Sequence, residues 1–381
     1  MKIVHCCLSC FYIDDYTYQE NMLVRQHVEA GHDVTVIAST ETFSANKIIA
    51  YQEPSTYIGS DGARVIRLPY RKFLPRRVMS KLRMHPGLRE ELNRLKPDVI
   101  MFHGMCGFEL LTVTNYIKKN PSVRFYADSH EDKYNSATSY FSKNTLYKFF
   151  YIPIIKLCKK YIDKVFYITH ESKLFCKEMY GLSDSDLEFF PLGGVVYPDA
   201  QYETIRKDMR IKLKIKSTDI VFFQSGKFDA KKKLIESIKS FSKTTGLDLK
   251  YFIAGDVQEE LEPEFYRLLE IDPRIKFLGW VNSEELIDLL CMADVYVQPG
   301  SQSATMQMSL AARCSVIIDD VPSHKHIFRN NGFLVNTDGE LFSAFSEIAN
   351  APDLINKMSE QSYAFAKEYL DYTRLAERLT R

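Results

Sequence analysis

The chain has 381 residues and a mass of 44.2 kDa, more than one hydrophobic core usually organises, which favours two domains. Its 45% hydrophobic and 26% charged residues exclude a disordered, collagenous or coiled-coil polypeptide. The net charge of +1, from 50 basic and 49 acidic residues, gives no overall indication of a nucleic-acid-binding protein.

Apolar runs alternate with helical patterns through the first half of the chain. The apolar runs predict buried parallel strands at 2–7, 33–38, 97–103, 123–127 and 164–168. A helical pattern over about residues 18–30 ends at Gly31, which can adopt the left-handed conformation that terminates a helix. This alternation predicts β-α-β units and therefore a doubly wound domain.

The first apolar run is too short and too interrupted by polar residues to be a secretion signal. No stretch reaches the roughly 18 apolar residues of a spanning helix, so we expect a cytoplasmic protein that is soluble or peripheral. The eight cysteines then indicate reduced thiols. Cys7 and Cys10 form a C-x-x-C without a second pair, which favours core thiols over a zinc or redox site.

A segment rich in Pro and Gly at 191–194 interrupts both patterns and predicts a hinge. The alternation then resumes, with strands expected at 219–223, 250–254, 275–278, 294–297 and 315–318, and helices from about 231, 258, 283, 304 and 338. A final helical stretch at 352–379 is long enough to pass back across the first domain. We expect domains at 1–195 and 196–360 and a returning helix at 361–381.

Two common functions of doubly wound sheets lack their motifs. Neither G-x-G-x-x-G after a strand nor G-x-x-x-x-G-K-[ST] occurs, which argues against hydride transfer and P-loop hydrolysis. Asp184 and Asp186 form a D-x-D, but it lies in a polar loop, where a solvated turn is favoured over a metal site.

A stronger pattern is QSGKFDAKKK at 224–233, which follows a predicted strand and is expected to open a helix. Gly226 lets the backbone approach a ligand closely. Lys227 and Lys232, the latter expected in the first helical turn, could converge with the helix amides on a diphosphate. A solvated lysine run accounts for this segment equally well.

Further segments follow in a fixed order: FIAG at 252–255, FLGWV at 277–281, ADVYVQP at 293–299 and NGFLV at 331–335. The first half adds GHDVTVI at 31–37 and PDVIMFH at 97–103. In this order and spacing the chain resembles, over essentially its whole length, the retaining GT-B glycosyltransferases of family 4. The resemblance implies an α/β fold of two doubly wound, Rossmann-like domains that face a central cleft.

The resemblance also implies a sugar transfer from a nucleotide sugar, expected to be a UDP- or GDP-sugar, with retained anomeric configuration and without a metal or cofactor. Lys227 takes the place of the arginine in the family's G-R-x-x-x-x-K diphosphate segment, and Lys232 takes the place of its lysine. The remaining expected donor-binding residues are Gly226, Trp280, Val281, Gly300, Ser303 and Gln307.

Polar residues also follow the predicted strand at 123–127 and are therefore expected at its carboxyl end. His130 resembles the family histidine that stabilises charge as the bond from sugar to phosphate breaks, and we expect it to be catalytic. His103 ends another strand, where a buried structural role is equally consistent. The residues expected on the acceptor side are His103, Asp128, Asp132 and Gln19.

Two departures from the family leave alternatives open. The Gly-Gly pair after the first strand is missing, and the loop at 11–21 is expected to shape an acceptor site instead. The paired glutamates are missing from 299–311, where Ser303 can cap a helix and Gln307 can hydrogen-bond a sugar or ribose. A weakly catalytic scaffold subunit and a GT-B sugar-nucleotide epimerase therefore remain alternatives.

The charge is unevenly distributed. Residues 1–198 carry 26 basic and 21 acidic residues, a net +5, and the remainder carries 24 and 28, a net −4. Residues 62–89 contain no acid but nine basic residues, and 140–160 mixes aromatic and basic residues. This composition suits peripheral contact with an anionic membrane or a polyprenyl diphosphate acceptor, and the absence of a recognition motif disfavours nucleic acid. Together with the basic first half, the family resemblance implies that the acceptor is a lipid-linked saccharide of a bacterial surface polysaccharide. Ordinary solvated basic helices remain an alternative, and the oligomeric state is left open.

Overall fold

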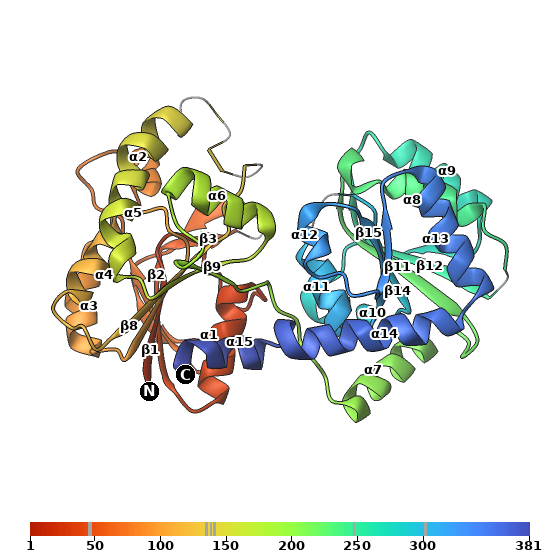
Figure 1. The fold of residues 1–381 in the computed structure, drawn as a ribbon, viewed down its shortest axis with the longest axis horizontal. Coiled ribbons are helices and arrows are strands. Elements are labelled where there is room, and N and C mark those ends of the chain that lie inside the picture. Colours follow the sequence, from red (N-terminus) through yellow and green to blue (C-terminus); the bar gives the residue numbers. More distant parts are fainter. Residues whose placement is uncertain (45–47, 134–135, 138, 140–141, 247, 301–302) are drawn as a thin grey trace. The chain divides into compact units, whose positions relative to one another are not determined.

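The computed structural model describes residues 1–44, 48–133, 136–137, 139, 142–246, 248–300 and 303–381. The chain forms two compact units (Figure 1). Unit 1 comprises Met1–Pro191 together with Tyr372–Arg381, and unit 2 comprises Leu192–Asp371. The part of the C-terminal helical stretch that belongs to unit 1 thus begins at Tyr372.

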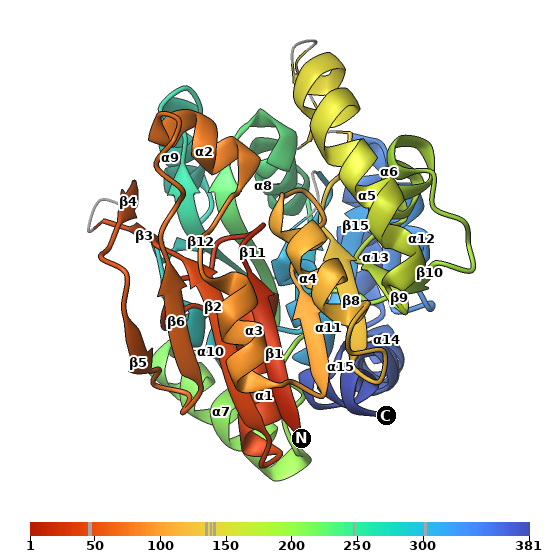
Figure 2. The same cartoon turned by 90° about the vertical axis from the view of Figure 1, so that its left-hand side faces the viewer.

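Unit 1 is built on an eight-stranded sheet in the order β10-β9-β8-β7-β1-β2-β6-β5. Figure 2 shows β5, β6, β2 and β1 in succession. The described strands of this sheet pair in parallel except β5, which is antiparallel to β6. The strands are β1 (Lys2–Cys7), β2 (Asp33–Ser39), β5 (Thr56–Ile58), β6 (Arg64–Leu68), β7 (Val99–Phe102), β8 (Arg124–Ser129), β9 (Lys164–Tyr167) and β10 (Leu187–Phe189), with a separate hairpin of β3 (Glu41–Phe43) and β4 (Ile49–Tyr51).

Unit 1 contains helices that follow the parallel strands, as right-handed β-α-β crossovers require. They are α1 (Gln19–Glu29), α2 (Arg76–Leu82), α3 (Leu88–Leu95), α4 (Glu109–Ile117), the π-helix η1 (Ser142–Tyr151), α5 (Ile152–Cys158), the 3-10 turn η2 (Lys159–Tyr161), α6 (His170–Tyr180) and α15 (Tyr372–Thr380). Gly31, with φ of +80°, follows the end of α1 as the sequence predicts.

The C-terminal helix α15 packs against α1 within unit 1. The Thr373 hydroxyl donates to Gln26 Oε1 at 2.7 Å, and Arg378 donates to the Phe189 carbonyl at 2.7 Å and pairs with Glu188. Leu375 and Leu379 are buried. The last ten residues are therefore an integral part of the core of unit 1.

Unit 2 has a six-stranded parallel sheet in the order β13-β12-β11-β14-β15-β16, the Rossmann order 3-2-1-4-5-6. Its elements are α7 (Asp199–Lys212), β11 (Ile220–Phe228), the 3-10 turn η3 (Ala230–Lys232), α8 (Leu234–Ser242), β12 (Leu249–Val257), α9 (Glu262–Ile271), β13 (Ile275–Phe277), α10 (Ser283–Met292), β14 (Val295–Gln298), α11 (Ala304–Ala311), β15 (Ser315–Asp319), α12 (Pro322–Lys325), β16 (Gly332–Val335), α13 (Asp338–Asn350), α14 (Asp353–Phe365) and the π-helix η4 (Ala366–Leu370).

Both sheets contain the point at which the strand order reverses. In unit 1 this point lies between β1 and β7, and in unit 2 it lies between β11 and β14. Doubly wound sheets bind ligands beyond the carboxyl ends of the strands at such a point. The loops that follow these four strands are therefore the places to look for a functional site.

Candidate functional site

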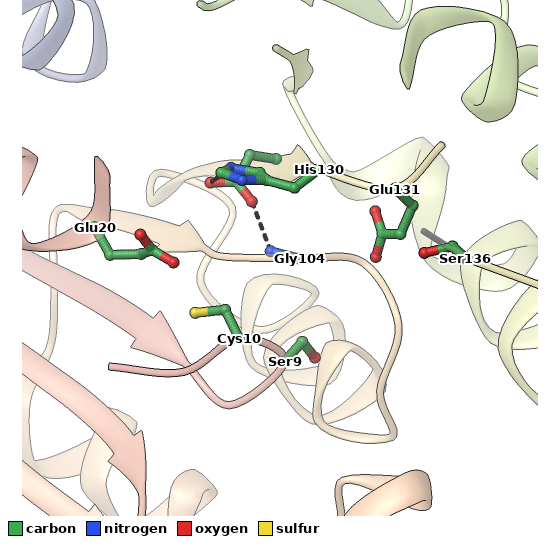
Figure 3. A pocket seen from close by; sticks show the side chains of 8 residues that line it. Ser9, Cys10, Glu20, Gly104, His130, Glu131 and Ser136 are labelled. Atoms are coloured by element: carbon green, nitrogen blue, oxygen red, sulfur yellow. Dashed lines mark hydrogen bonds and ion pairs between the residues drawn. The ribbon is translucent and has the colours of Figure 1, made fainter. Parts of the chain in front are cut away.

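A pocket of about 240 Å³ lies at the reversal point of unit 1 (Figure 3). Its walls come from the loops after β1, β7 and β8 and from the first turn of α1. The lining residues are Ser9, Cys10, Glu20, Gly104, Asp128, His130, Glu131 and Ser136. The pocket therefore holds the predicted His130 and Asp128 together with acids and hydroxyls that the sequence analysis had not assigned.

Asp128 organises the back of this pocket. Its Oδ2 accepts a hydrogen bond from His103 Nδ1 at 2.7 Å, and its Oδ1 accepts one from the Gly104 amide at 2.6 Å. His130 Nε2 lies 3.8 Å from Asp128 Oδ2. His103 and Asp128 are almost completely buried, whereas the His130 side chain is 36% exposed toward solvent. The structure thus brings three predicted site residues into one cluster.

Charge pairing dominates the protonation of this cluster. Burial alone lowers the pKa of His103, but the Asp128 carboxylate outweighs burial and raises that pKa to about 10. Burial likewise lowers the pKa of His130, and Asp128 raises it to about 9. Burial raises the pKa of Asp128, and the two histidines lower it well below its usual range. At neutral pH the cluster is therefore an Asp128 carboxylate between two imidazolium groups.

Two further carboxylates lie on either side of His130 in the view of Figure 3. Glu20 belongs to α1 and is buried, and Glu131 accepts a hydrogen bond from the Ser129 hydroxyl at 2.5 Å. Ser9 Oγ is buried without a hydrogen-bond partner among the described residues. Such a lining of acceptors and a hydroxyl suits a ligand that carries several hydroxyl groups.

The reversal point of unit 2 carries the predicted donor-site residues. Gly226 and Lys227 lie in the last part of β11, which extends to Phe228 and so beyond the predicted end at 223. Gly226 has φ of +151°, a conformation that favours glycine. The Lys227 ammonium lies 5.9 Å from the ring centre of Trp280, and both side chains are exposed.

The prediction that Lys232 lies in the first turn of a helix is wrong. Lys232 ends the 3-10 turn η3, and Lys233, with φ of +50°, separates that turn from α8. The Asp229 side chain caps the turn by accepting from the amides of Lys231 and Lys232, and the left-handed Lys233 ends the turn before α8 begins. Lys232 is half-buried, and this burial lowers its pKa.

The loop after β14 packs directly against η3. A Cβ atom on Gly300 would lie 2.1 Å from the Lys231 carbonyl oxygen, so only glycine permits this approach. Ser303 caps α11 by accepting from the Thr305 amide at 3.2 Å, as predicted. Gln307, one turn further on, is 7% exposed, and its Oε1 has no hydrogen-bond partner among the described residues. Because buried acceptors are normally hydrogen-bonded, this oxygen is available to accept from a donor group of a ligand.

The remaining predicted site residues are Gln19, Asp132 and Val281. Gln19 is buried in α1, donates to the Pro191 carbonyl at 3.0 Å, and leaves Oε1 without a partner among the described residues. Asp132 follows Glu131 and is partly exposed, and Val281, next to Trp280, is also partly exposed. Gln302, which precedes Ser303 in the chain, lies outside the described residues, as do Tyr140 and Phe141.

The alternative metal and thiol sites receive no support. Asp184 forms ion pairs with Lys173 and Lys177 at 2.7 Å each, and Asp186 accepts from Ser183. The eight cysteines, including Cys7 and Cys10, are free thiols. Within the described ranges, no three His, Cys, Asp or Glu side chains gather in a way that could hold a metal ion.

One basic residue of the 62–89 segment is not at the surface as its charge suggested. Arg67 is buried in β6, where it pairs with Asp14 at 2.9 Å and donates to the carbonyl oxygens of Tyr12 and Ser39. This arginine holds the loop at 11–21 in place. It therefore does not contribute to an exposed basic surface.

Comparison with solved structures shows which fold the chain adopts. The structure resembles sucrose-phosphate synthase from Thermosynechococcus elongatus, with 14% identity, a TM-score of 0.67, and 100% of this chain and 97% of that chain covered. It also resembles Anabaena Alr3699/HepE in complex with UDP (12%; TM-score 0.67; 100% and 98% covered) and WaaG, a glycosyltransferase involved in lipopolysaccharide biosynthesis (14%; TM-score 0.63; 99% and 99% covered). The predicted α/β, GT-B fold is confirmed.

One family model matches part of the sequence of unit 2. Residues 205–370 match the family model of glycosyl transferases group 1. No curated protein sequence gives a significant match. Over this segment the chain is similar to glycosyltransferases of group 1, in agreement with the predicted enzyme class of a glycosyltransferase.

Proposed function

We propose that this glycosyltransferase moves a sugar from a UDP- or GDP-sugar to a saccharide acceptor, with retained configuration and without a metal. The observation that carries the proposal is the close approach of Gly300 to the Lys231–Lys232 backbone at the reversal point of the unit 2 sheet, followed on α11 by the buried Gln307 Oε1, which has no partner among the described residues. UDP in complex with the structurally similar HepE supports a nucleotide-sugar donor.

The donor side is assigned from charge and hydrogen-bonding capacity. Lys227 and Lys232 supply positive charge to a diphosphate, and the capped amino-terminal end of α11 adds its amides and dipole. Gln307 Oε1 accepts from a hydroxyl of the sugar or ribose, replacing the missing glutamates with a neutral group. Trp280, whose ring centre lies 5.9 Å from the Lys227 ammonium, and its chain neighbour Val281 are assigned to the remaining donor contacts.

The pocket of unit 1 is assigned to sugar recognition. Its volume of about 240 Å³ is below the roughly 300–1,000 Å³ typical of drug-sized ligands and suits one sugar ring. Glu20 and Glu131 accept hydrogen bonds from sugar hydroxyls, and Asp132 and Gln19 flank the acceptor side. Three acidic side chains, those of Glu20, Asp128 and Glu131, line the pocket beside the single imidazolium of His130, which also disfavours an acidic sugar in this pocket.

The proposed chemistry is a substitution at the anomeric carbon. The bond from that carbon to the phosphate oxygen breaks, and a bond from an acceptor oxygen forms on the same face. The acceptor proton leaves with the nucleoside diphosphate, so atoms and charge balance. Lys227 and Lys232 stabilise the charge that develops on the diphosphate, and the His130 imidazolium contributes to the field around the transferred sugar.

A screen of nucleotide sugars tests this function. A donor that binds the native state raises the melting temperature in proportion to the logarithm of its concentration over its dissociation constant. Each donor that stabilises the protein is then incubated with saccharide acceptors, and the products are analysed. A new glycosidic product supports the proposal. A donor isomerised without acceptor identifies an epimerase, and a protein inert with every donor and acceptor identifies a scaffold subunit.

The acceptor is proposed to be a lipid-linked saccharide used in bacterial surface polysaccharide synthesis, reached by a cytoplasmic enzyme at the membrane surface. Around α2, Phe73, Leu74 and Val78 are exposed, with Phe73 at 62%. The surrounding basic side chains are also exposed: Arg71, Lys72, Arg76, Arg77 and Lys81. Apolar side chains within a basic ring suit the surface of an anionic bilayer. No described helix combines the length and apolar character needed to cross a bilayer.

Neutralising Arg71, Lys72, Arg76 and Arg77 with glutamine is expected to abolish flotation with vesicles of phosphatidylglycerol and phosphatidylcholine. Each basic residue near an anionic surface contributes about 1 kcal/mol, so the loss of four lowers partitioning by more than about 100-fold. The control replaces the exposed Lys207, Lys212, Lys214 and Lys216 of unit 2 with glutamine, the same change in charge elsewhere. Equal flotation of both variants would refute the membrane contact.

A further inference from the structure

A continuous row of buried imidazole rings runs through unit 1 behind the pocket. His103 Nε2 lies 2.9 Å from His5 Nδ1, and His5 Nε2 lies 2.9 Å from His27 Nδ1. At the far end, His27 Nε2 lies 3.0 Å from the Ala376 carbonyl oxygen of α15. The three rings come from β1, α1 and the loop after β7, and each is at most 1% exposed.

The two ends of the row fix how many protons it holds. Both ends are acceptors, so the four hydrogen bonds need four protons on three rings, and one of the rings is an imidazolium. A carbonyl oxygen can only accept, so His27 Nε2 carries a proton and donates it to Ala376. His27 Nδ1 is then an acceptor if His27 is neutral, and His5 Nε2 donates to it. By the same step His5 Nδ1 accepts from His103 Nε2. When His27 and His5 are both neutral, all three hydrogen bonds point from His103 toward the C-terminal helix.

His103 meets a second acceptor at its other nitrogen. Its Nδ1 lies 2.7 Å from Asp128 Oδ2, and an ionised carboxylate can only accept. His103 therefore donates from both nitrogens, which requires the doubly protonated imidazolium. The direction of the hydrogen bonds along the row therefore requires a doubly protonated His103, which is the charge state that the ion pair with Asp128 also favours.

The protonation tendencies of the other two rings place the extra proton on His103. Burial lowers the pKa of His27 to about 4, and burial, with His27 and His103 as neighbours, lowers the pKa of His5 well below its usual value. Both rings are therefore neutral at pH 7. A row of three histidines contains one cation, and that cation lies next to the pocket.

We infer that His5 and His27 are positioning residues for sugar transfer, which hold His103 doubly protonated so that the Asp128 carboxylate is fixed beside His130. The Ala376 carbonyl sets the direction of the row, so the last helix of the chain takes part in preparing the pocket. The effect on catalysis rests on the proposed function. The proton arrangement itself does not.

Other ionisable groups face the row and contribute to its titration. Cys7 on β1, Cys10 in the loop after it and Glu20 on α1 face the pocket end together with Asp128 and His130. At the other end, His32 lies 6.0 Å from His27 between ring centres and contacts the N-terminal amino group. A pH dependence must therefore be assigned by comparing variants of the row itself.

The first experiment is long-range 1H–15N correlation spectroscopy of the full-length protein labelled with 15N-histidine at pH 7.5. Single His→Gln variants assign the signals. We expect protons on both ring nitrogens of His103 and on Nε2 alone in His5 and His27. A single ring proton on His103 would overturn the inference, even if the enzyme transfers sugar normally. The expected pattern without any transfer would instead count against the proposed function.

The second experiment compares His5→Phe with His5→Gln. Phenylalanine removes both hydrogen bonds, whereas the glutamine amide can accept and donate. In His5→Phe the His103 imidazolium loses its second acceptor and its pKa falls, so the alkaline limb of the kcat/KM profile shifts downward by about one pH unit, a tenfold loss at a fixed pH on that limb. His5→Gln keeps the limb in place. Equal profiles for both variants, or a shift that tracks only the melting temperature, would contradict a positioning role.

Discussion

Replacing Lys232 with alanine is expected to lower kcat/KM for sugar transfer by about 100- to 1,000-fold, the usual cost of removing a group that stabilises charge in the transition state. The half-buried Lys232 side chain lies beside Gly226, where a Cβ atom would be 3.9 Å from Lys232 Cε, and burial already lowers the pKa of Lys232. A nearby diphosphate would therefore stabilise its charged form strongly. Initial rates with the donor found in the thermal screen measure the effect.

Lys231→Ala is the matched control, because Lys231 lies in the same 3-10 turn with its side chain exposed. We expect less than a threefold change from it, whereas Lys232→Arg restores part of the lost activity by keeping the charge. In Lys232→Ala the thermal shift caused by the free nucleoside diphosphate is also expected to disappear. Equal losses in Lys231→Ala and Lys232→Ala would show that the turn, and not the charge of Lys232, matters.

Replacing Asp128 with asparagine is expected to cost about 3–5 kcal/mol in the free energy of unfolding, because it leaves buried histidines without their anion. The lowered pKa of Asp128 makes its contribution present above the unfolded value near 3.9 and lost as the pH falls. The raised pKa of His103 makes its contribution present below about 6.5 and lost as the pH rises through about 10. The difference between wild type and variant is therefore largest between about pH 4.5 and 6.5.

Urea unfolding at pH 4, 5.5, 7.5 and 9.5 measures this difference. Asp184→Asn is the control, because it removes a carboxylate from exposed ion pairs with Lys173 and Lys177 and is expected to cost less than about 1 kcal/mol. In Asp128→Asn the pKa of His130 is also expected to fall from about 9 toward its ordinary value. A loss of stability that is the same at every pH would contradict the ion-pair explanation.

Most of the parallel sheet could be predicted from the sequence, because buried parallel strands are nearly continuous apolar runs. The prediction located β1, β2, β7, β8 and β9 in unit 1, with ends that differ by a few residues. It did not include β3–β6 or β10. Several of these are three-residue strands, and β6 contains two arginines, one of them the buried Arg67. Short edge strands with charged residues carry little periodic signal.

The site was predictable only where a residue follows a strand. Asp128, His130 and Lys227 were found in this way, since the carboxyl ends of parallel strands meet at one edge. Glu20 was not, because its place in the pocket depends on how α1 packs. His5 and His27 were missed for the same reason: each is a single polar residue in an otherwise ordinary strand or helix, and only the fold places them in contact. Contacts between residues that are far apart in the sequence produce no pattern in the local spacing of residue types, so the sequence alone does not reveal them.

The chain passes between the two units twice, and this determines where it can be cut to build chimeric enzymes. The chain leaves unit 1 after Pro191 and re-enters it at Tyr372, so unit 2 is topologically an insertion into unit 1. The two connections meet at their unit 2 ends, where the Gly194 amide donates to the Leu370 carbonyl at 2.8 Å. Inserted domains with adjacent ends are exchanged most easily. A chimera should therefore take 192–371 as one cassette and retain the host's last ten residues, since a fragment that ends at Pro191 would lack the acceptor for His27.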